Sequence, residues 1–168
     1  MKCLYKLQDD DEMRSACESN NFSETISIDN VSFTPLDSSA FFEFLSECRR
    51  LKELKFFSCQ FSDNHSVVRL SKYLSNATAC NVLSLKINSC RVNNISKHLS
   101  EALKSENCKL SELEIRKNNI GEEGAKYLSE ALKSKDCKLS ELDIRFNKLT
   151  HQGANLLIQT TKIGRAHV

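Results

Sequence analysis

The chain has 168 residues, of which 40% are hydrophobic and 27% charged, a composition typical of one globular domain rather than of a disordered or fibrous protein. Its 24 basic and 22 acidic residues leave a net charge of +2, which gives no general attraction to nucleic acid or to anionic lipid. The sequence contains no apolar run approaching the roughly 18 residues of a membrane-spanning helix, so no membrane association is expected.

The N-terminal segment, residues 1–21, is predicted to be helical. It begins MKCLYKLQDDDEM, which has no apolar core and becomes acidic at Asp9, so it does not have the pattern of a secretory signal peptide. We therefore expect a reducing, cytoplasmic setting for the 8 cysteines. No Cys-x-x-Cys occurs, which argues against a zinc or thioredoxin-type site. The acidic run after Gln8 lacks the spacing of an EF-hand and is interpreted as a solvated helix start.

From residue 22 onward the chain is organised as a repeat. Residues 108–116 read CKLSELEIR and residues 137–145 read CKLSELDIR, with eight identities in nine positions at a separation of 29. The pattern L-x-x-L-x-L-x-x-N/C-x-L fits four units, and a degenerate first copy precedes them. The last apolar positions of the five units are residues 33, 61, 92, 120 and 149. This pattern is the signature of leucine-rich repeats.

Each unit predicts one strand and one helix. The L-x-L core alternates with period 2, which predicts short strands near 26–28, 53–56, 84–87, 112–115 and 141–144. The rest of each unit has a period of about 3.6, which predicts amphipathic helices at 37–47, 65–76, 93–105, 122–134 and 151–161. Because a single unit cannot bury its apolar side, the units must stack. The predicted fold class is an α/β leucine-rich repeat solenoid, a horseshoe with parallel strands on the concave face and helices on the convex face.

Two sets of small polar or thiol side chains recur at fixed positions of the repeat. Asn118 and Asn147 occupy the position where the chain turns away from the strand, and Cys59 and Cys90 replace the amide in earlier units. A side chain there can serve buried backbone groups that would otherwise lack hydrogen-bond partners. Cysteines also recur two residues before the first apolar position of three units, at residues 80, 108 and 137. We expect these thiols to be buried and unpaired packing residues.

The period of 28 to 31 residues resembles the ribonuclease-inhibitor type of leucine-rich repeat. The segments CLYKLQDDDEM, residues 3–13, and TPLDSSAFFEFLSECRRLKELKFFSCQF, residues 34–61, also resemble the start of the repeat domain in NOD-like receptors, the NACHT–LRR family. The matching residues are Cys3-Leu4-Tyr5, Gln8, Pro35-Leu36-Asp37 and Leu51-x-x-Leu54 with Cys59. Lys6 departs from the Glu that is usual in that family.

This resemblance implies a domain organisation and a function. Residues 1–21 would end the NACHT-associated helical region, and residues 22–162 would form a ribonuclease-inhibitor-type repeat domain. The chain would then be a non-catalytic protein-interaction module, the ligand-sensing or autoinhibitory fragment of a cytosolic innate immune receptor. Its partner would be another protein or its own upstream NACHT module, with no nucleic acid, membrane or small-molecule cofactor. No G-x-x-x-x-G-K-S/T occurs, so no phosphate site is assigned.

Two other classes of protein share this repeat pattern. A stand-alone adaptor or inhibitor resembling ribonuclease inhibitor needs no upstream module and stays open as the alternative. An enzyme-linked repeat protein, such as a Ran-type GTPase activator, would need a catalytic loop, whereas the connections predicted here are short and regular. We therefore expect no enzymatic activity and predict no catalytic, cofactor-binding or metal-binding residues.

The C-terminal residues 163–168 read IGRAHV and break the amphipathic pattern of the preceding helix. They resemble the translated start of a sequencing adapter, and we interpret them as an artefact. The repeat domain is then expected to be incomplete at its C-terminus, with no polar cap on its last helix.

The candidate functional surface consists of the exposed strand positions of the repeats. In neighbouring strands these positions should align in rows that form the concave face. The candidate partner-binding residues are Lys55, Phe57, Lys86, Asn88, Glu112, Glu114, Arg116, Glu141, Asp143 and Arg145. Phe57, an apolar residue at an exposed strand position, is the candidate anchor. The alternative, which the sequence leaves open, is a self-neutralising solvated face in which Lys86 faces Glu114 and the arginines reach back to Glu114 and Asp143.

Overall fold

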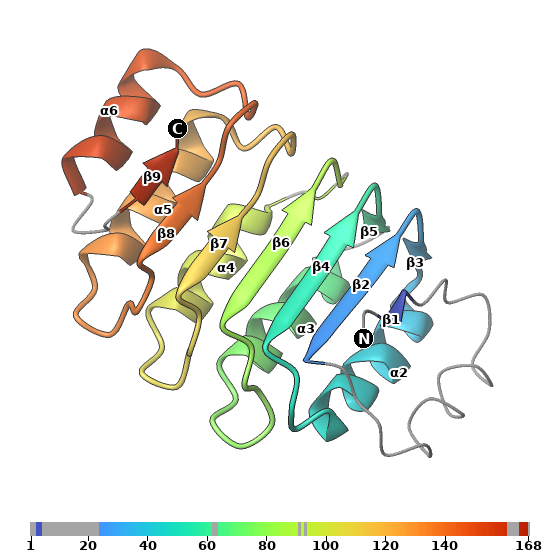
Figure 1. The fold of residues 1–168 in the computed structure, drawn as a ribbon. Helices are drawn as coiled ribbons and strands as arrows, with labels where there is room; N and C mark the ends of the chain where they lie inside the picture. The colour runs from blue at the N-terminus through green and yellow to red at the C-terminus, as the bar shows by residue number, and fades with distance from the viewer. Residues whose placement is uncertain are drawn as a thin grey trace.

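The structure is a computed structural model that describes residues 3–4, 24–61, 64–90, 92, 94–160 and 165–167. Strands and helices alternate along most of this length (Figure 1). The strands are β1 (Cys3–Leu4), β2 (Thr25–Asp29), β3 (Ser32–Phe33), β4 (Glu53–Phe57), β5 (Gln60–Phe61), β6 (Ser84–Asn88), β7 (Glu112–Glu114), β8 (Glu141–Asp143) and β9 (Arg165–His167). The helices are α2 (Pro35–Glu47), α3 (Asn64–Leu74), α4 (Ile95–Leu103), α5 (Gly121–Lys133) and α6 (His151–Thr160).

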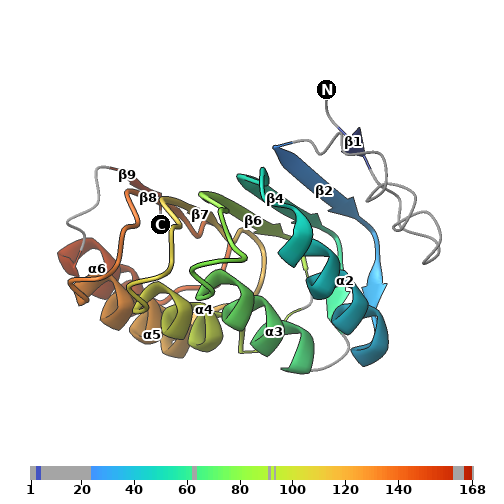
Figure 2. The ribbon, with the colours of Figure 1, turned by 90° about the horizontal axis from the view of Figure 1, so that it is seen from below.

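The main sheet contains seven strands in the order β1-β2-β4-β6-β7-β8-β9, and every neighbouring pair is parallel. The register is constant from unit to unit, because Leu54, Leu85, Leu113 and Leu142 are each opposite one another in successive strands. Helices α2 to α6 lie along one side of this sheet (Figure 2). No helix of the described residues lies over its other side, so the exposed strand positions remain open there.

The predicted strands and helices of the five units are confirmed, with bounds that differ by three residues or fewer. The first unit is more regular than its sequence suggests, because β2 pairs with β4 over all five of its residues. A second, two-stranded parallel sheet of β3 and β5 was not predicted. The chain also has no helix in the described residues that is long and apolar enough to cross a membrane.

The prediction of a helical N-terminal segment is wrong at the two residues of that segment that the structure describes. Cys3 and Leu4 form β1, which pairs in parallel with Ile26 and Ser27 of β2. The open edge of β2 has unpaired backbone N–H and C=O groups, and two extended residues can form hydrogen bonds with some of them. The remainder of residues 1–21 lies outside the described residues, as do residues 161–164.

The core between the sheet and the helices changes character along the chain. In the first two units it is aromatic, because the rings of Phe33, Phe41, Phe56 and Phe61 lie with centroids 5.2 to 6.1 Å apart. These distances are typical of favourable offset and edge-to-face pairs. In later units the same space is filled by aliphatic residues such as Leu99, Leu113 and Leu128. Burial of each such side chain contributes about 1.5 to 3 kcal/mol to stability.

The turn position after each strand holds a ladder of side-chain to backbone hydrogen bonds. Asn118 donates from Nδ2 to the carbonyl oxygens of Ile87, at 2.6 Å, and of Arg116, at 3.0 Å. Its Oδ1 accepts from the backbone N–H of Cys90 at 3.0 Å, and Asn147 Oδ1 accepts in turn from the Asn118 N–H at 2.7 Å. Each of these two amides thus serves buried backbone groups, as predicted, and these groups belong both to its own unit and to the unit before it.

The cysteines at the same position make a weaker version of these contacts. Cys90 Sγ lies 3.6 Å from the carbonyl oxygen of Phe56 and 3.4 Å from that of Asn88. Cys59 Sγ lies 3.7 Å from the Ile28 carbonyl oxygen and 3.4 Å from that of Phe57. A thiol has one weak donor and a poor acceptor, so it reproduces the donor half of the amide and leaves out the acceptor half.

Replacing Asn118 by Ala should destabilise the fold strongly, because it leaves two carbonyls and the Cys90 N–H buried without this partner. We expect the free energy of unfolding in urea to fall by about 3 kcal/mol. Asn118→Cys should cost about half as much, since a thiol already occupies this position at Cys59 and Cys90. Lys133→Ala, at an exposed helix position, is the control and should change stability by less than about 0.5 kcal/mol. Equal stability of Asn118→Ala and the control would contradict the ladder's role.

The recurrent thiols are free, but they are not equally buried. Cys80 and Cys108 are buried, as predicted, whereas Cys137 is half-buried. The prediction that Cys137 is buried is therefore wrong. No described residue of a following unit covers Cys137 at the position equivalent to its own. Burial raises the pKa of all three thiols above the ordinary value, which lowers the fraction of reactive thiolate.

Thiol labelling of the native protein at neutral pH should follow this order of burial. We expect an aromatic disulfide reagent to modify Cys137 first and Cys80 and Cys108 much more slowly, with all three released by denaturation. Peptide mapping by mass spectrometry identifies each site. A disulfide between any two of these residues in the freshly purified protein, or faster labelling of Cys80 than of Cys137, would contradict the expectation.

Candidate functional site

The ten predicted surface residues lie on one face of the main sheet or directly after its strands. In β4 and β6 they alternate with fully buried residues, so each points away from the helices. The register places Lys55, Lys86, Glu114 and Asp143 in one row across β4, β6, β7 and β8. Phe57 is opposite Asn88, and Glu112 is opposite Glu141, in the flanking rows. Arg116 and Arg145 follow β7 and β8 at the same relative position. We refer to these residues together as the sheet face.

A first group of charges is centred on Lys86. Its Nζ lies 3.1 Å from Glu112 Oε1, 3.4 Å from Glu53 Oε1 and 4.0 Å from Glu114 Oε2. Lys55 Nζ contacts the other oxygen of Glu53 at 2.8 Å. Lys55 and Lys86 are directly opposite each other, where like charges repel. The shared carboxylate of Glu53 offsets that repulsion.

The electrostatic effect of this group can be followed in the pKa values. Partial burial acts to raise the pKa of Glu53, but the hydrogen bond and charge of Lys55 outweigh it, and the pKa is lowered. Burial likewise acts to lower the pKa of Lys86, while Glu112 and Glu53 outweigh it and raise the pKa. Both groups therefore stay charged near neutral pH.

In the same row as Glu53 and Glu112 lies Ser84. Its hydroxyl is the one buried side-chain group of the described residues without a hydrogen-bond partner.

A second group of charges joins β7 and β8. Glu114 and Asp143 are opposite each other, and Arg116 bridges them through contacts of 3.2 Å to Glu114 and 2.6 Å to Asp143. Arg145 Nη2 approaches the same Asp143 carboxylate at 2.8 Å. Asn88 completes the group, because its Nδ2 donates to Glu114 at 2.7 Å and its Oδ1 accepts from the Arg116 N–H at 2.9 Å.

Asp143 is the most strongly perturbed carboxylate of the sheet face. Its side chain is 11% exposed, and burial alone would raise its pKa. Hydrogen bonds from Arg145 and Arg116 outweigh burial and hold the pKa of Asp143 well below its ordinary value. The carboxylate is thus charged at all physiological pH values, and it fixes both guanidinium groups in place.

The predicted approach of the arginines to Glu114 and Asp143 is confirmed, as is the pairing of Lys86 with Glu114 across the ladder. The closer partners of Lys86 were missed. Glu53, which pairs with both Lys86 and Lys55, is not among the candidate residues. The period of two in β4 indicates that Glu53 lies on the same face of the sheet as Lys55, two residues later. Phe57 is half-buried rather than exposed, which weakens it as an anchor. A shallow depression of about 180 Å³ lies over β7 and β8 and is lined by charged members of the sheet face.

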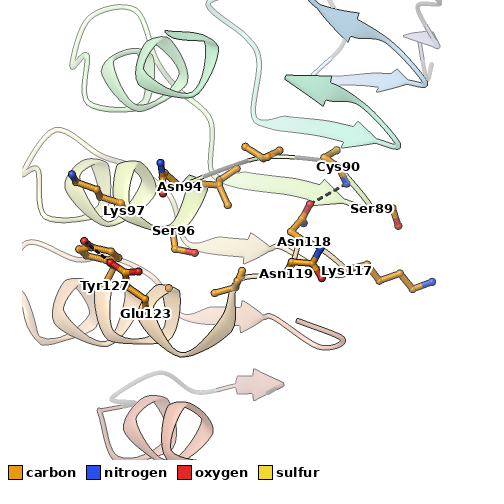
Figure 3. A pocket seen from close by; sticks show the side chains of 14 residues that line it. Ser89, Cys90, Asn94, Ser96, Lys97, Lys117, Asn118, Asn119, Glu123 and Tyr127 are labelled. Carbon is orange, nitrogen blue, oxygen red and sulfur yellow. Dashed lines mark hydrogen bonds between the residues drawn. The ribbon is translucent and has the colours of Figure 1, made fainter. Parts of the chain in front are cut away.

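A separate hollow of about 790 Å³ lies between the connections β6–α4 and β7–α5 (Figure 3). The Asn118 to Cys90 hydrogen bond of the turn ladder borders it, and at the opposite side the Tyr127 hydroxyl donates to Glu123 at 3.3 Å. Residues 91 and 93 of the first connection lie outside the described residues, so we assign no ligand to this hollow. Within the described residues no cluster of three or more His, Cys, Asp or Glu could hold a metal ion.

Comparison with known families supports the repeat. A family model described as Leucine Rich repeat matches residues 106–129, which contain β7 and most of α5, and residues 135–157, which contain β8 and most of α6. Residues 106–157 are a leucine-rich repeat region. No curated protein matches the chain. Leucine-rich repeats stack into extended binding surfaces, so the match indicates a protein-interaction module.

The depressed pKa of Asp143 makes stability depend on pH. A carboxylate whose pKa is lowered by folding stabilises the native state above its unfolded pKa of about 3.9, and this contribution is lost as the pH falls toward the folded pKa. Asp143→Asn should therefore lower the free energy of unfolding by about 2 kcal/mol at pH 7, and the difference should shrink between about pH 5 and pH 2. Urea denaturation across this range measures both effects.

Glu106→Gln serves as the control for this titration, because Glu106 is exposed and its carboxylate forms no ion pair in the described residues. Its stability profile should run parallel to that of the parent chain. A constant difference between Asp143→Asn and the parent protein at all pH values would contradict the assigned role of the arginine contacts.

Proposed function

We propose that this chain is a non-catalytic protein-interaction module that binds its partner on the sheet face, and that it is the ligand-sensing or autoinhibitory repeat region of a cytoplasmic NOD-like receptor. The observation that carries the proposal is the arrangement of fixed charges on the side of the sheet that no described helix covers. The receptor assignment is supported by the sequence resemblance at residues 3–13 and 34–61.

The spacing of the two layers supports a curved, ribonuclease-inhibitor-type horseshoe with the sheet face on its concave side. Neighbouring parallel strands lie about 4.8 Å apart, whereas packed helices need about 8 to 10 Å. One strand and one helix are added per unit, so the helical layer must be longer than the strand layer. The stack then bends toward the strands, and the sheet face becomes the inner wall of a groove that can surround part of a partner.

The ion pairs prepare the sheet face for binding. Side chains that are already held by neighbours lose little conformational freedom when a partner binds, and this loss is a major cost of association. Lys86, Arg116 and Arg145 are each held by at least one carboxylate before a partner arrives. The arrangement of these charges also determines how a partner is oriented. Acidic residues begin three strands, at Glu53, Glu112 and Glu141, and the two arginines follow the ends of β7 and β8. A partner with basic groups facing this row of glutamates fits best.

In the receptor assignment the partner is another protein or the chain's own upstream NACHT module. No nucleic acid, membrane or cofactor takes part in this proposal. A stand-alone adaptor or inhibitor resembling ribonuclease inhibitor would use the same sheet face with a different partner. The two possibilities differ in what is encoded before residue 1.

The first test is to read the gene upstream of Met1. A frame that encodes a G-x-x-x-x-G-K-S/T phosphate loop and joins this chain supports the receptor. An in-frame stop codon close upstream contradicts the receptor and leaves the adaptor.

The second test measures binding of the encoded upstream module, or of the partner found for the adaptor, by titration calorimetry. The double variant Glu112→Gln/Glu141→Gln should weaken binding about tenfold, because it removes two charges of the sheet face. Glu101→Gln/Glu130→Gln removes two exposed charges from the helical side and is the matched control. Equal effects of the two double variants would contradict binding on the sheet face.

A further inference from the structure

The residue directly before each turn position has a left-handed backbone. Its φ is 58° at Asn30, 54° at Ser58, 55° at Ser89, 57° at Lys117 and 63° at Phe146. Asn tolerates this conformation because its short polar side chain can bond locally, whereas a bulky side chain rarely adopts it. Phe146 therefore stands at a position that the fold makes costly for an aromatic residue.

The turn ladder enforces the backbone at Phe146 and aims its side chain outward. The neighbouring Asn147 is buried and held by hydrogen bonds to Ile144 and Asn118, at 2.7 Å each. The ring of Phe146 is consequently 70% exposed, more than Ile158 at 58% or Leu83 at 41%, the other large exposed apolar residues described. Phe146 contributes little to the core, so packing does not explain an aromatic residue at this position.

One lysine lies beside this ring, and a second is exposed on the same loop. Lys117 Nζ lies 5.8 Å from the ring centroid, within cation–π range, and its side chain points away from the hollow in Figure 3. Lys148 is exposed two residues further along the loop. Neither lysine has an ion-pair partner among the described residues, in contrast to Arg145, which is held by Asp143. An exposed apolar ring with one ammonium group beside it and a second on the same loop is suited to carboxylates that flank an apolar side chain.

We propose that Phe146, Lys117 and Lys148 form a second docking point, the loop patch, for an acidic segment of a protein partner that carries an aromatic or aliphatic residue between its carboxylates. The apolar side chain packs on the Phe146 ring, and the carboxylates pair with the two lysines. The loop patch lies past the C-terminal ends of β7 and β8, next to the arginine end of the sheet face. A partner whose basic groups face the glutamate row can therefore extend its acidic part onto the loop patch.

Among macromolecules with negative charge, a protein segment fits this patch better than a nucleic acid does. Single-stranded nucleic acids bind along basic grooves that track several phosphates, with aromatic side chains spaced to stack successive bases. The loop patch has one exposed ring and two free lysines, and the adjacent sheet face carries Glu112, Glu114, Glu141 and Asp143. Most of those carboxylates are already paired with Lys86, Arg116 or Arg145. Two lysines and one ring can engage two carboxylates and one apolar side chain, but not the successive phosphates and bases of a nucleic acid strand.

The proposal of the loop patch rests on the proposed function only in assuming that the partner is a protein. A peptide display experiment tests the loop patch directly. A library of random peptides on phage is selected against the full chain. Some selected peptides should bind the parent protein but neither Phe146→Asn nor the double variant Lys117→Glu/Lys148→Glu. These peptides should be enriched in Asp or Glu around an aromatic or aliphatic residue. Their synthetic forms, measured by fluorescence anisotropy, should bind each variant about tenfold more weakly.

The variants allow loss of binding to be separated from loss of folding. Phe146→Asn places at this position the residue type found at Asn30, so its melting temperature should equal or exceed that of the parent chain. Leu83→Asn, an exposed apolar residue preceding β6, and Lys135→Glu, an exposed lysine preceding β8, are the matched controls and should bind normally.

The remaining outcomes each contradict the loop patch. These are selected peptides that are neutral or basic, peptides retained by Phe146→Asn, absence of any enriched peptide, and tighter binding of a single-stranded oligonucleotide that depends on Phe146. The same peptides measured on Glu112→Gln/Glu141→Gln keep the two proposals apart. Binding that survives this double variant but not Phe146→Asn supports the loop patch whether or not the sheet face binds a partner.

Discussion

The stacking of this protein depends on one requirement: the backbone groups at the turn after each strand are buried and must be hydrogen-bonded. In the later units an asparagine side chain meets this requirement in its own unit and in the unit before it, because the Asn118 amide bonds to Cys90, Ile87 and Arg116. The Asn118 N–H in turn donates to the side chain of Asn147 in the next unit. Since a buried polar group without a partner is costly, a shift of one unit against the next would break several such bonds together. The ladder therefore fixes the register of the later units.

A fixed register decides what the sheet face presents. Because the side-chain period of a strand is two, every residue of β4 or β6 that is not packed on the helices points to the open side, and equivalent residues of successive units become neighbours. Lys55 meets Lys86, and Glu114 meets Asp143, so the repeat itself creates like-charge contacts. An opposite charge from a neighbouring position offsets each repulsion. Glu53 does so between the two lysines, and Arg116 does so between Glu114 and Asp143.

The sequence predicts the arrangement of backbone and rows well, because spacing and alternation carry that information. The partners within the rows depend on how far each side chain reaches, which spacing does not encode. Lys86 bonds more closely to Glu112 and Glu53 than to the Glu114 opposite it. The short strand β1 was missed because two residues give no period to recognise. Phe146 could have been found from its position before Asn147, where the other units have Asn, Ser or Lys, but its exposure requires the turn geometry.

The early and the late units of the stack are stabilised by different interactions. This difference explains why two of the candidate binding groups lie in the late units. In the early units the turn position has a thiol, whose hydrogen bonds are weak, and the clustered rings of Phe33, Phe41, Phe56 and Phe61 compensate by packing. In the later units aliphatic side chains fill the core, and amide hydrogen bonds, which depend on direction, hold the turn position. Directional bonds hold side chains to a defined geometry more strictly than apolar contacts do. The arginine group of the sheet face and the exposed ring of Phe146 lie in those later units, where rigid support for recognition is available.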